Sequence, residues 1–487
     1  MMHTGKYLWK RLGPCCMSAA IVAGVLAFLA GCAVGPDYRK PEAPAPVSYK
    51  ENADWKVAQP QEALARGAWW KLFKDPQLDA LVEQVNISNQ NVAAAEAQYR
   101  QALAVVRAGR AGYFPTVTAG AQATRSLRSS NTSSVAVVTS EANDFLVTGT
   151  ASWEPDVWGK VRRTVEANQA GAQASAADLE SIRLSSQTLL AQNYFQLCAL
   201  DAQKALLDAT VAAYEKSLQL TKNRYTYGVA SRAEVLQAET QLKSTQAQAI
   251  DVGVQRSQLE HSIAVLIGKP ASVFSIPATP LFASPPAVPV GIPSDLLERR
   301  PDVAAVERRV AAANAQIGVA EAAYYPSIML GATGGFESSD ISNWLSWPSR
   351  LWSVGLSLSQ TLFDAGLRSA LTDQARAAYD ANVAAYRQTV LTGFQEVEDN
   401  LAALRILEQE ARVQGEAVTA ARRSLELSMN QYKAGTIGYL EVVVVQAILL
   451  SNERTAVDIK GRRMAASVLL IKAIGGGWDS SALHSEE

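Results

Sequence analysis

Tyr113-Phe114-Pro115-Thr116-Val117 returns in the second half of the sequence as Tyr324-Tyr325-Pro326-Ser327-Ile328. The two copies lie about 211 residues apart, and later landmarks in the two halves keep nearly the same offset. One such landmark is a tyrosine followed by a glycine, found about 207 residues apart as Tyr225 with Gly228 and Tyr432 with Gly435. The chain is therefore predicted to contain one structural unit twice, with a small length difference that a loop absorbs.

Each half is predicted to run as helix, two strands, long helix, turn and helix, because its helical stretches are rich in Ala, Gln, Glu, Leu and Arg. At ~1.5 Å per residue the long helix of the first half reaches ~100 Å, which indicates an elongated antiparallel array. The expected elements are helices 75–113, 160–227 and 231–268 with strands 116–126 and 145–154, then helices 295–324, 366–434 and 437–474 with strands 327–336 and 352–362.

The second long helix carries a seam typical of a coiled coil. Its apolar residues recur with an average spacing of about 3.5, the period at which a stripe keeps facing a neighbouring helix. These residues are Val383, Tyr386, Val390, Phe394, Val397, Leu401 and Leu404.

Proline-rich stretches divide the chain into segments, because proline interrupts helices and ladders. The predicted segments are a lipoprotein signal peptide 1–31, a lipidated Pro-rich segment 32–74, repeat 1 at 75–268, a Pro-rich linker 269–294, repeat 2 at 295–474 and a flexible tail 475–487.

The composition points away from enzymes and from nucleic-acid binding. The 487 residues carry 45 Lys and Arg against 46 Asp and Glu, so no basic excess is available for phosphate backbones. Only 3 His and 4 Cys occur, and His3, Cys15 and Cys16 lie in the first segment. The remainder does not supply a His/Cys zinc cage or a His-based triad. We therefore expect no catalytic residue, no metal site and no nucleic-acid partner.

The first thirty-two residues resemble an export and lipidation signal. A basic start with Lys6, Lys10 and Arg11 precedes an apolar run at 19–29 that is too short to span a membrane. The run ends in Leu29-Ala30-Gly31-Cys32, the pattern of a bacterial lipobox. We expect cleavage before Cys32 and a covalent lipid on its sulfur, which would hold the protein on a membrane. The alternative is an ordinary signal peptide with an incidental cysteine.

The predicted strands alternate between apolar and polar residues. In the last strand Trp352, Val354, Leu356 and Leu358 oppose a row of serines and glycine. Such alternation fits transmembrane β-strands, although a soluble half-buried sheet has the same pattern. The lipidation signal favours the membrane. Four strands do not close around a lumen, so three chains supplying twelve strands are expected.

Two motifs carry a resemblance to a known family. They are Ala68-Trp69-Trp70-Lys71-Leu72-Phe73-Lys74-Asp75-Pro76-Gln77-Leu78, and Gly291-Ile292-Pro293-Ser294-Asp295-Leu296-Leu297-Glu298-Arg299-Arg300-Pro301-Asp302 followed by Ala313-Asn314-Ala315-Gln316-Ile317-Gly318. The sequence resembles TolC-type outer-membrane efflux lipoproteins, in the branch serving resistance-nodulation-division (RND) pumps.

The resemblance implies a mainly α fold with a membrane β-barrel. Two structural repeats per chain would build a homotrimer with a 12-stranded barrel in the outer membrane, a long α-helical barrel in the periplasm and an equatorial region. It also implies a passive exit duct that works with a periplasmic adaptor (membrane fusion protein) and an inner-membrane RND pump. No cofactor is implied apart from the lipid on Cys32.

Two turns between long helices, at 224–231 and 431–438, are predicted to end their helices with Gly228 and Gly435 in the left-handed conformation. The resemblance implies that these tips close the pore and meet the adaptor. The gate residues it implies are Tyr225, Glu234, Tyr432, Glu441 and Val444. The adaptor-contact residues it implies are Gly228, Val229, Ser231, Gly435, Thr436 and Ile437.

The second tip departs from the family pattern. Val444 stands where a second acidic residue occurs, and Ile437 stands where a basic partner can occur, so the seal is expected to be more hydrophobic than ionic. Three copies of Glu441 facing one axis would attract cations. The alternative is that Glu441 lies on a solvated face.

Two other functional classes stay open from the sequence. An exit duct for protein or metal export would share the architecture, whereas a periplasm-spanning structural lipoprotein would be a helical tether without a pore. The two pairs of alternating strands favour a duct, because a tether has no use for them.

Overall fold

The computed structural model describes residues 33–43, 46, 48–52, 68–127, 129, 141–279, 285–286, 288 and 296–481. The expected signal peptide, Cys32, most of the predicted linker after residue 279 and the tail from 482 lie outside these ranges. The chain divides into two compact units. Unit 1 combines residues up to 41 with 100–172 and 307–384, and unit 2 combines 42–99, 173–306 and 385–487.

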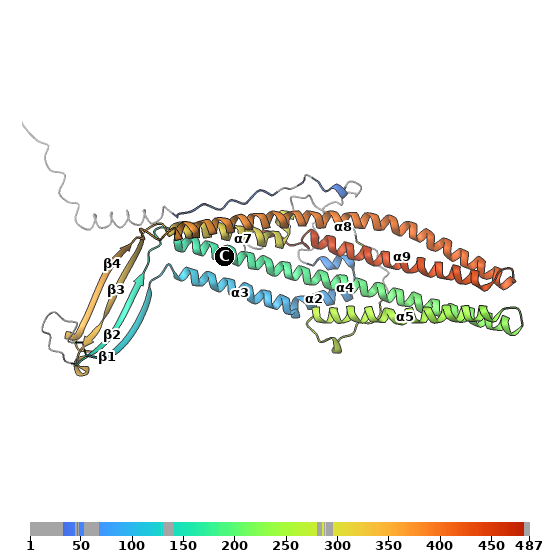
Figure 1. Cartoon of the computed structure of the whole chain (residues 1–487), viewed down its shortest axis with the longest axis horizontal. Coiled ribbons are helices and arrows are strands. Elements are labelled where there is room, and N and C mark those ends of the chain that lie inside the picture. Colours follow the sequence, from blue (N-terminus) through green and yellow to red (C-terminus); the bar gives the residue numbers. More distant parts are fainter. Residues whose placement is uncertain are drawn as a thin grey trace, which may run out of the picture. The chain divides into compact units, whose positions relative to one another are not determined.

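Unit 1 contains a four-stranded antiparallel sheet in the order β1-β2-β3-β4 (Figure 1). The strands are β1 Thr116–Leu127, β2 Glu141–Trp153, β3 Ser327–Ser338 and β4 Arg350–Ser359. Each half of the sequence supplies one hairpin, and β2 pairs with β3 where the halves meet, with Gly149 opposite Gly334.

Two strand boundaries differ from the prediction by three residues or more. β2 begins at Glu141 instead of 145, because the β1–β2 ladder continues to the pair Leu127–Glu141 and Arg125 donates to the Glu141 carboxylate there. β4 ends at Ser359 instead of 362, because the Gln360 side chain turns back to donate to the carbonyl of Tyr324.

The long helices are α4 Lys160–Thr226, α5 Arg232–Leu266, α8 Leu367–Ala434 and α9 Tyr439–Ala473, close to the predicted ranges. The apolar seam predicted for the second long helix, α8, is confirmed, since Tyr386, Val390, Phe394 and Val397 are buried. No helix in the described ranges has the length and apolar character needed to cross a membrane.

The predicted single helix 75–113 is wrong: it is two helices, α2 Pro76–Ser88 and α3 Gln90–Ala111. Asn89 divides them. Its carbonyl oxygen Oδ1 caps α3 by accepting from the amides of Asn91 and Val92, at 2.9 and 3.1 Å. Its Nδ2 donates to the carbonyl of Leu266 at 2.7 Å, so the break serves the end of α5 as well.

The predicted helix 295–324 is also interrupted. The structure has a short helix α6 Leu296–Arg299 and then α7 Pro301–Ala322. Proline is well suited to the first turn of a helix but disfavours helical geometry in the residue before it, so Pro301 starts α7 and Arg300 falls between the helices. Arg300 is buried and forms ion pairs with Asp302 and Glu396 at 2.6 and 2.7 Å.

The segment that follows the lipidation motif is clamped within unit 1. Arg163 donates to the carbonyls of Val34 and Gly35, at 3.2 and 3.1 Å. Asn314 donates to the carbonyl of the next residue. Gly318 lies so close that a Cβ added to Gly35 would sit 2.4 Å from its Cα. The motif at 313–318 therefore holds residues 35–36 in place.

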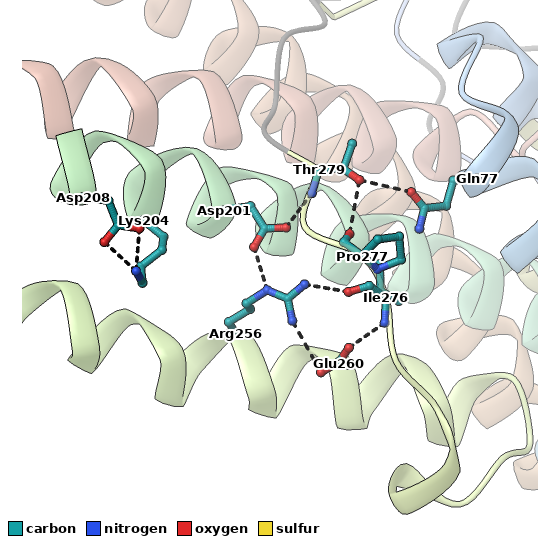
Figure 2. Close-up of polar contacts among 9 residues, drawn as sticks. All are labelled: Gln77, Asp201, Lys204, Asp208, Arg256, Glu260, Ile276, Pro277 and Thr279. Atoms are coloured by element: carbon teal, nitrogen blue, oxygen red, sulfur yellow. Dashed lines mark hydrogen bonds and ion pairs between the residues drawn. The ribbon is translucent and has the colours of Figure 1, made fainter.

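In unit 2 the first part of the linker is strapped to α4 and α5 by a polar node (Figure 2). Asp201 accepts from Arg256 Nε at 2.6 Å and from the amide of Thr279 at 2.9 Å. Glu260 accepts from Arg256 Nη1 at 3.4 Å and from the amide of Ile276 at 2.6 Å. Arg256 also donates to the carbonyl of Ile276 at 2.8 Å. Every charged group of the node has an oppositely charged partner, as burial requires.

Asp201→Ala should destabilise unit 2 by about 2–3 kcal/mol, because it leaves Arg256 and the amide of Thr279 without their buried acceptor. Asp208→Ala is the matched control, since Asp208 is exposed, lies two turns further along the same helix and pairs with Lys204. Its cost should stay within about 1 kcal/mol. Thermal unfolding followed by circular dichroism compares the two, and equal midpoints would contradict the assignment.

Candidate functional site

The sheet has two chemically distinct faces. On β4 one face carries Trp352, Val354, Leu356 and Leu358, with exposed fractions of 64–76%. Cross-strand register continues this apolar face through β3, where Leu330 opposes Leu356 and Ala332 opposes Val354. The other face of β4 carries the intervening serines and a glycine. An exposed apolar face backed by a polar one fits a strand between lipid and water.

The sheet is open at both edges. β1 and β4 each have one neighbour in the sheet order, so within the described part of the chain their outer edges have no partner strand. These edges are 12 and 10 residues long. Open edges of this length require a partner, above all in hydrocarbon, where no water satisfies backbone groups.

The two helical tips of unit 2 have the same backbone motif. At the first tip Gly228 (φ +72°) donates to the carbonyl of Tyr225 at 2.9 Å, and Val229 donates to the carbonyl of Arg224 at 2.8 Å. At the second tip Gly435 (φ +79°) and the residue after it make the equivalent bonds, both at 3.0 Å. These are Schellman caps, so both glycines end their helices in the predicted left-handed conformation.

The side chains of the two tips differ. Tyr225 is 47% exposed, whereas its counterpart Tyr432 is 1% exposed. Tyr432 therefore does not line the surface of the tip in this chain. It packs with Tyr214, Tyr439, Leu218 and Val442 in the apolar core between the tips.

Arg224 fastens the first tip to the second. Its Nη1 donates to the carbonyls of Tyr432 and Lys433 at 3.0 and 3.3 Å, and its guanidinium carbon lies 4.6 Å from the centroid of the Tyr432 ring. These carbonyls belong to the last turn of α8, where carbonyl groups have no intrahelical N–H partner. A cation at the C-terminal end of a helix is also favoured by the helix dipole.

Two further hydrogen bonds cross the same core. Thr221 and the Tyr432 hydroxyl share a bond of 3.2 Å, and the Tyr439 hydroxyl donates to Ser217 at 3.3 Å. Burial raises the pKa of Tyr439, so its hydroxyl remains a donor. Sequence reasoning missed Arg224, Thr221, Ser217 and Tyr439 as partners. Their only signal is that Ser217, Thr221 and Arg224 recur at helical spacing on one face of α4.

The remaining predicted gate residues lie on the surface of this chain. Glu441 is exposed, Val444 is 50% exposed and Glu234 is half-buried. Glu441 is in the first turn of α9, and Glu234 is in the first turn of α5, where its amide donates to the Ser231 hydroxyl at 3.3 Å. The two acidic residues thus occupy equivalent positions in the two repeats.

The predicted adaptor-contact residues are mostly exposed. Val229 is 63% exposed, and Gly228, Ser231, Gly435 and Thr436 are exposed as well. Ile437 is the exception, because it is half-buried and packs against the apolar core between the tips.

Two residues of potential chemistry are structural. Cys198 is buried, and burial raises the pKa of its thiol to about 12, so it stays protonated and unreactive. The thiol therefore packs as a small buried hydrophobe. His261 is exposed. Within the described ranges no three His, Cys, Asp or Glu side chains are grouped so that they could hold a metal ion.

Known proteins match this chain over nearly its whole length. The sequence model of the family described as "Outer membrane efflux protein" matches residues 81–269 and 292–476. The probable efflux pump outer membrane protein TtgC of Pseudomonas putida is 31% identical over 95% of both chains. The pyoverdine export outer membrane protein OpmQ of Pseudomonas aeruginosa is 31% identical over 85% of this chain and 88% of its own.

Solved structures give the same result. The outer-membrane channel OprN superposes with a TM-score of 0.84 at 29% identity, over 92% of this chain and 100% of that one. The open-state MtrE outer membrane channel of Neisseria gonorrhoeae gives 0.81 at 25% identity, over 92% and 99%. The mainly α fold with a membrane sheet and two repeats, expected from the sequence, is confirmed. The chain is thus an outer-membrane protein that belongs to the outer membrane efflux protein family.

Proposed function

We propose that this chain is the outer-membrane exit duct of a tripartite efflux system. It would passively conduct drugs or other small toxic compounds that an inner-membrane RND pump delivers through a periplasmic adaptor. One observation carries the proposal: the sheet exposes an apolar face and leaves both edges open, which suits a wall segment of a membrane barrel. The similarity to efflux and export proteins of Pseudomonas supports it.

The barrel closes in a homotrimer. Four strands per chain give twelve in three chains, with β4 of one chain pairing with β1 of the next. A closed ring of this kind removes every open edge. The lipid on Cys32 adds a second attachment to the outer membrane, and the clamp on residues 34–36 holds that attachment close to the sheet-bearing unit.

The native mass of the lipidated particle, extracted in detergent, tests this function. A mature chain is about 49 kDa, scaled from 52.1 kDa for the whole sequence, so three chains weigh about 147 kDa. We expect the trimeric mass and ion conductance in planar bilayers. A stable monomer without conductance would favour a periplasmic structural tether instead.

We place the gate of the duct at the helical tips, with Tyr225, Glu234, Glu441 and Val444 facing the pore and Tyr432 supporting them from inside. The exposed glycine turns offer a surface where an adaptor can approach closely. Gly228, Val229 and Ser231 would contact it from the first tip, and Gly435, Thr436 and Ile437 from the second.

Arg224→Met should raise the open probability of the trimer in planar bilayers at least about tenfold, because two hydrogen bonds from a charged donor are lost. Arg232→Met is the matched control, since this exposed residue also lies at the first tip. If the open probability of Arg224→Met equals that of Arg232→Met, Arg224 does not hold the gate closed.

Glu441→Gln should lower the preference of the channel for cations, because three carboxylates around one axis attract them. Glu441→Asp keeps the charge and should keep the preference. Reversal potentials in a salt gradient measure both variants. Equal potentials for wild type and Glu441→Gln would mean that Glu441 lies on the outer surface of the tips.

A further inference from the structure

At the loop end of the sheet, the arginines lie on one face and most of the carboxylates lie on the other. Directly paired residues of an antiparallel sheet lie on the same face. Arg350 pairs with Phe336, two positions from the pair Gly334–Trp352, so Arg350 shares the apolar face of Trp352. Phe336 also pairs with Val147, which pairs with Ala121, and this places Arg125, four residues further along β1, on the same face.

The carboxylates nearby take the opposite face. Asp144 pairs with Thr124, and Glu337 pairs with Leu146, and these are the residues that alternate with the apolar row. The exception is Glu141, which lies on the apolar face and forms an ion pair with Arg125. The side chains of this pair are 72% and 58% exposed, so the pair leaves the guanidinium open to other partners.

Aromatic rings lie on the same rim as the arginines. The Arg350 guanidinium carbon lies 4.0 Å from the centroid of the Trp347 ring, which is 72% exposed. Phe145, on the apolar face, contacts Trp344 with ring centroids 6.0 Å apart. Aromatic rings with cations are typical of the border between hydrocarbon and headgroups.

This rim is at the outer end of the sheet. All four strands join helices at the other end, through 112–115, 154–159, 323–326 and 360–366. Because the helices of this family lie in the periplasm, the rim with Arg125 and Arg350 faces the outer leaflet. The apolar row from Trp352 to Leu358 lies between it and the periplasmic end.

We propose that Arg125 and Arg350 bind the phosphate groups of a phosphorylated glycolipid in the outer leaflet. The inference rests on the proposed barrel. Arg125 lies on β1 and Arg350 on β4, the two open edges, so closure brings them together from neighbouring chains and creates three sites per trimer. Guanidinium groups bind phosphate through paired hydrogen bonds, and the neighbouring rings accept acyl chains and sugar faces.

Lipid retention by the purified trimer tests the site, measured by native mass spectrometry with added bis-phosphorylated lipid A and with the same lipid lacking both phosphates. Arg350→Gln should weaken retention of the phosphorylated lipid about fivefold, as expected for one cation near an anionic surface. Glu141→Gln should strengthen it, because Arg125 is released from its partner. Arg422→Gln is the matched control, since this exposed arginine is also paired with a glutamate, in unit 2.

Equal retention of the two lipids, or equal retention by Arg350→Gln and its control, would overturn the site. Trimer mass and conductance are recorded on the same samples. If trimer mass and conductance are normal while the two lipids are retained equally, the lipid site is wrong but the proposed duct is unaffected. Loss of trimer and conductance in the wild type would instead contradict the duct itself.

Discussion

The backbone groups along the outer edges of β1 and β4 determine what the rest of the molecule can be. A soluble sheet can cover such edges with loops or charged side chains, but in hydrocarbon each unpaired group costs several kcal/mol. The sheet has an exposed apolar face, so hydration of that face is also unfavourable. Pairing of β4 with β1 of another copy solves both problems, because it places the apolar face in lipid and removes the edges.

The two structural repeats in each chain make the ring of strands regular. Each repeat contributes one hairpin and one pair of long helices, so each chain supplies two similar wall segments. The repeats diverge at the tips. The two tips share a backbone motif, yet Tyr225 is exposed and Tyr432 is buried under Arg224 from the other tip. Two identical repeats would not form this one-sided contact between Arg224 and Tyr432.

The fold was largely predictable because its main signals are local. Helix formers, alternating strands and the glycine turns follow from periodicity over a few residues. The misplaced boundaries have distant causes. Asn89 divides a helix because its side chain reaches the end of α5, 177 residues away in sequence. Arg300 leaves the helical path for partners on α8 and at the end of α9, where it donates to the carbonyl of Ala473 at 2.9 Å. No single-sequence pattern identifies such partners.

The site was less predictable for the same reason. The motifs that identify the family are mainly structural: Trp69 is buried and donates to Gln187, and Asn314 and Gly318 hold residues 35–36. The tips instead make contacts between residues about 207 positions apart in sequence, which local patterns do not reveal. Glu441 was identifiable only through the resemblance, since an acidic residue in the first turn of a helix is ordinary.

The strength of the contacts between the tips sets what an opening partner must supply. Four hydrogen bonds join them: two from Arg224 to carbonyls, one between the hydroxyls of Thr221 and Tyr432, and one from Tyr439 to Ser217. At about 0.5–1.5 kcal/mol each, they favour the observed arrangement by about 2–6 kcal/mol per chain. Moving a two-state equilibrium from 1:99 to 99:1 requires about 5.5 kcal/mol of differential binding. A partner that binds the exposed turns of the tips would therefore have to favour the separated arrangement by an amount of this order before the contacts between the tips are broken.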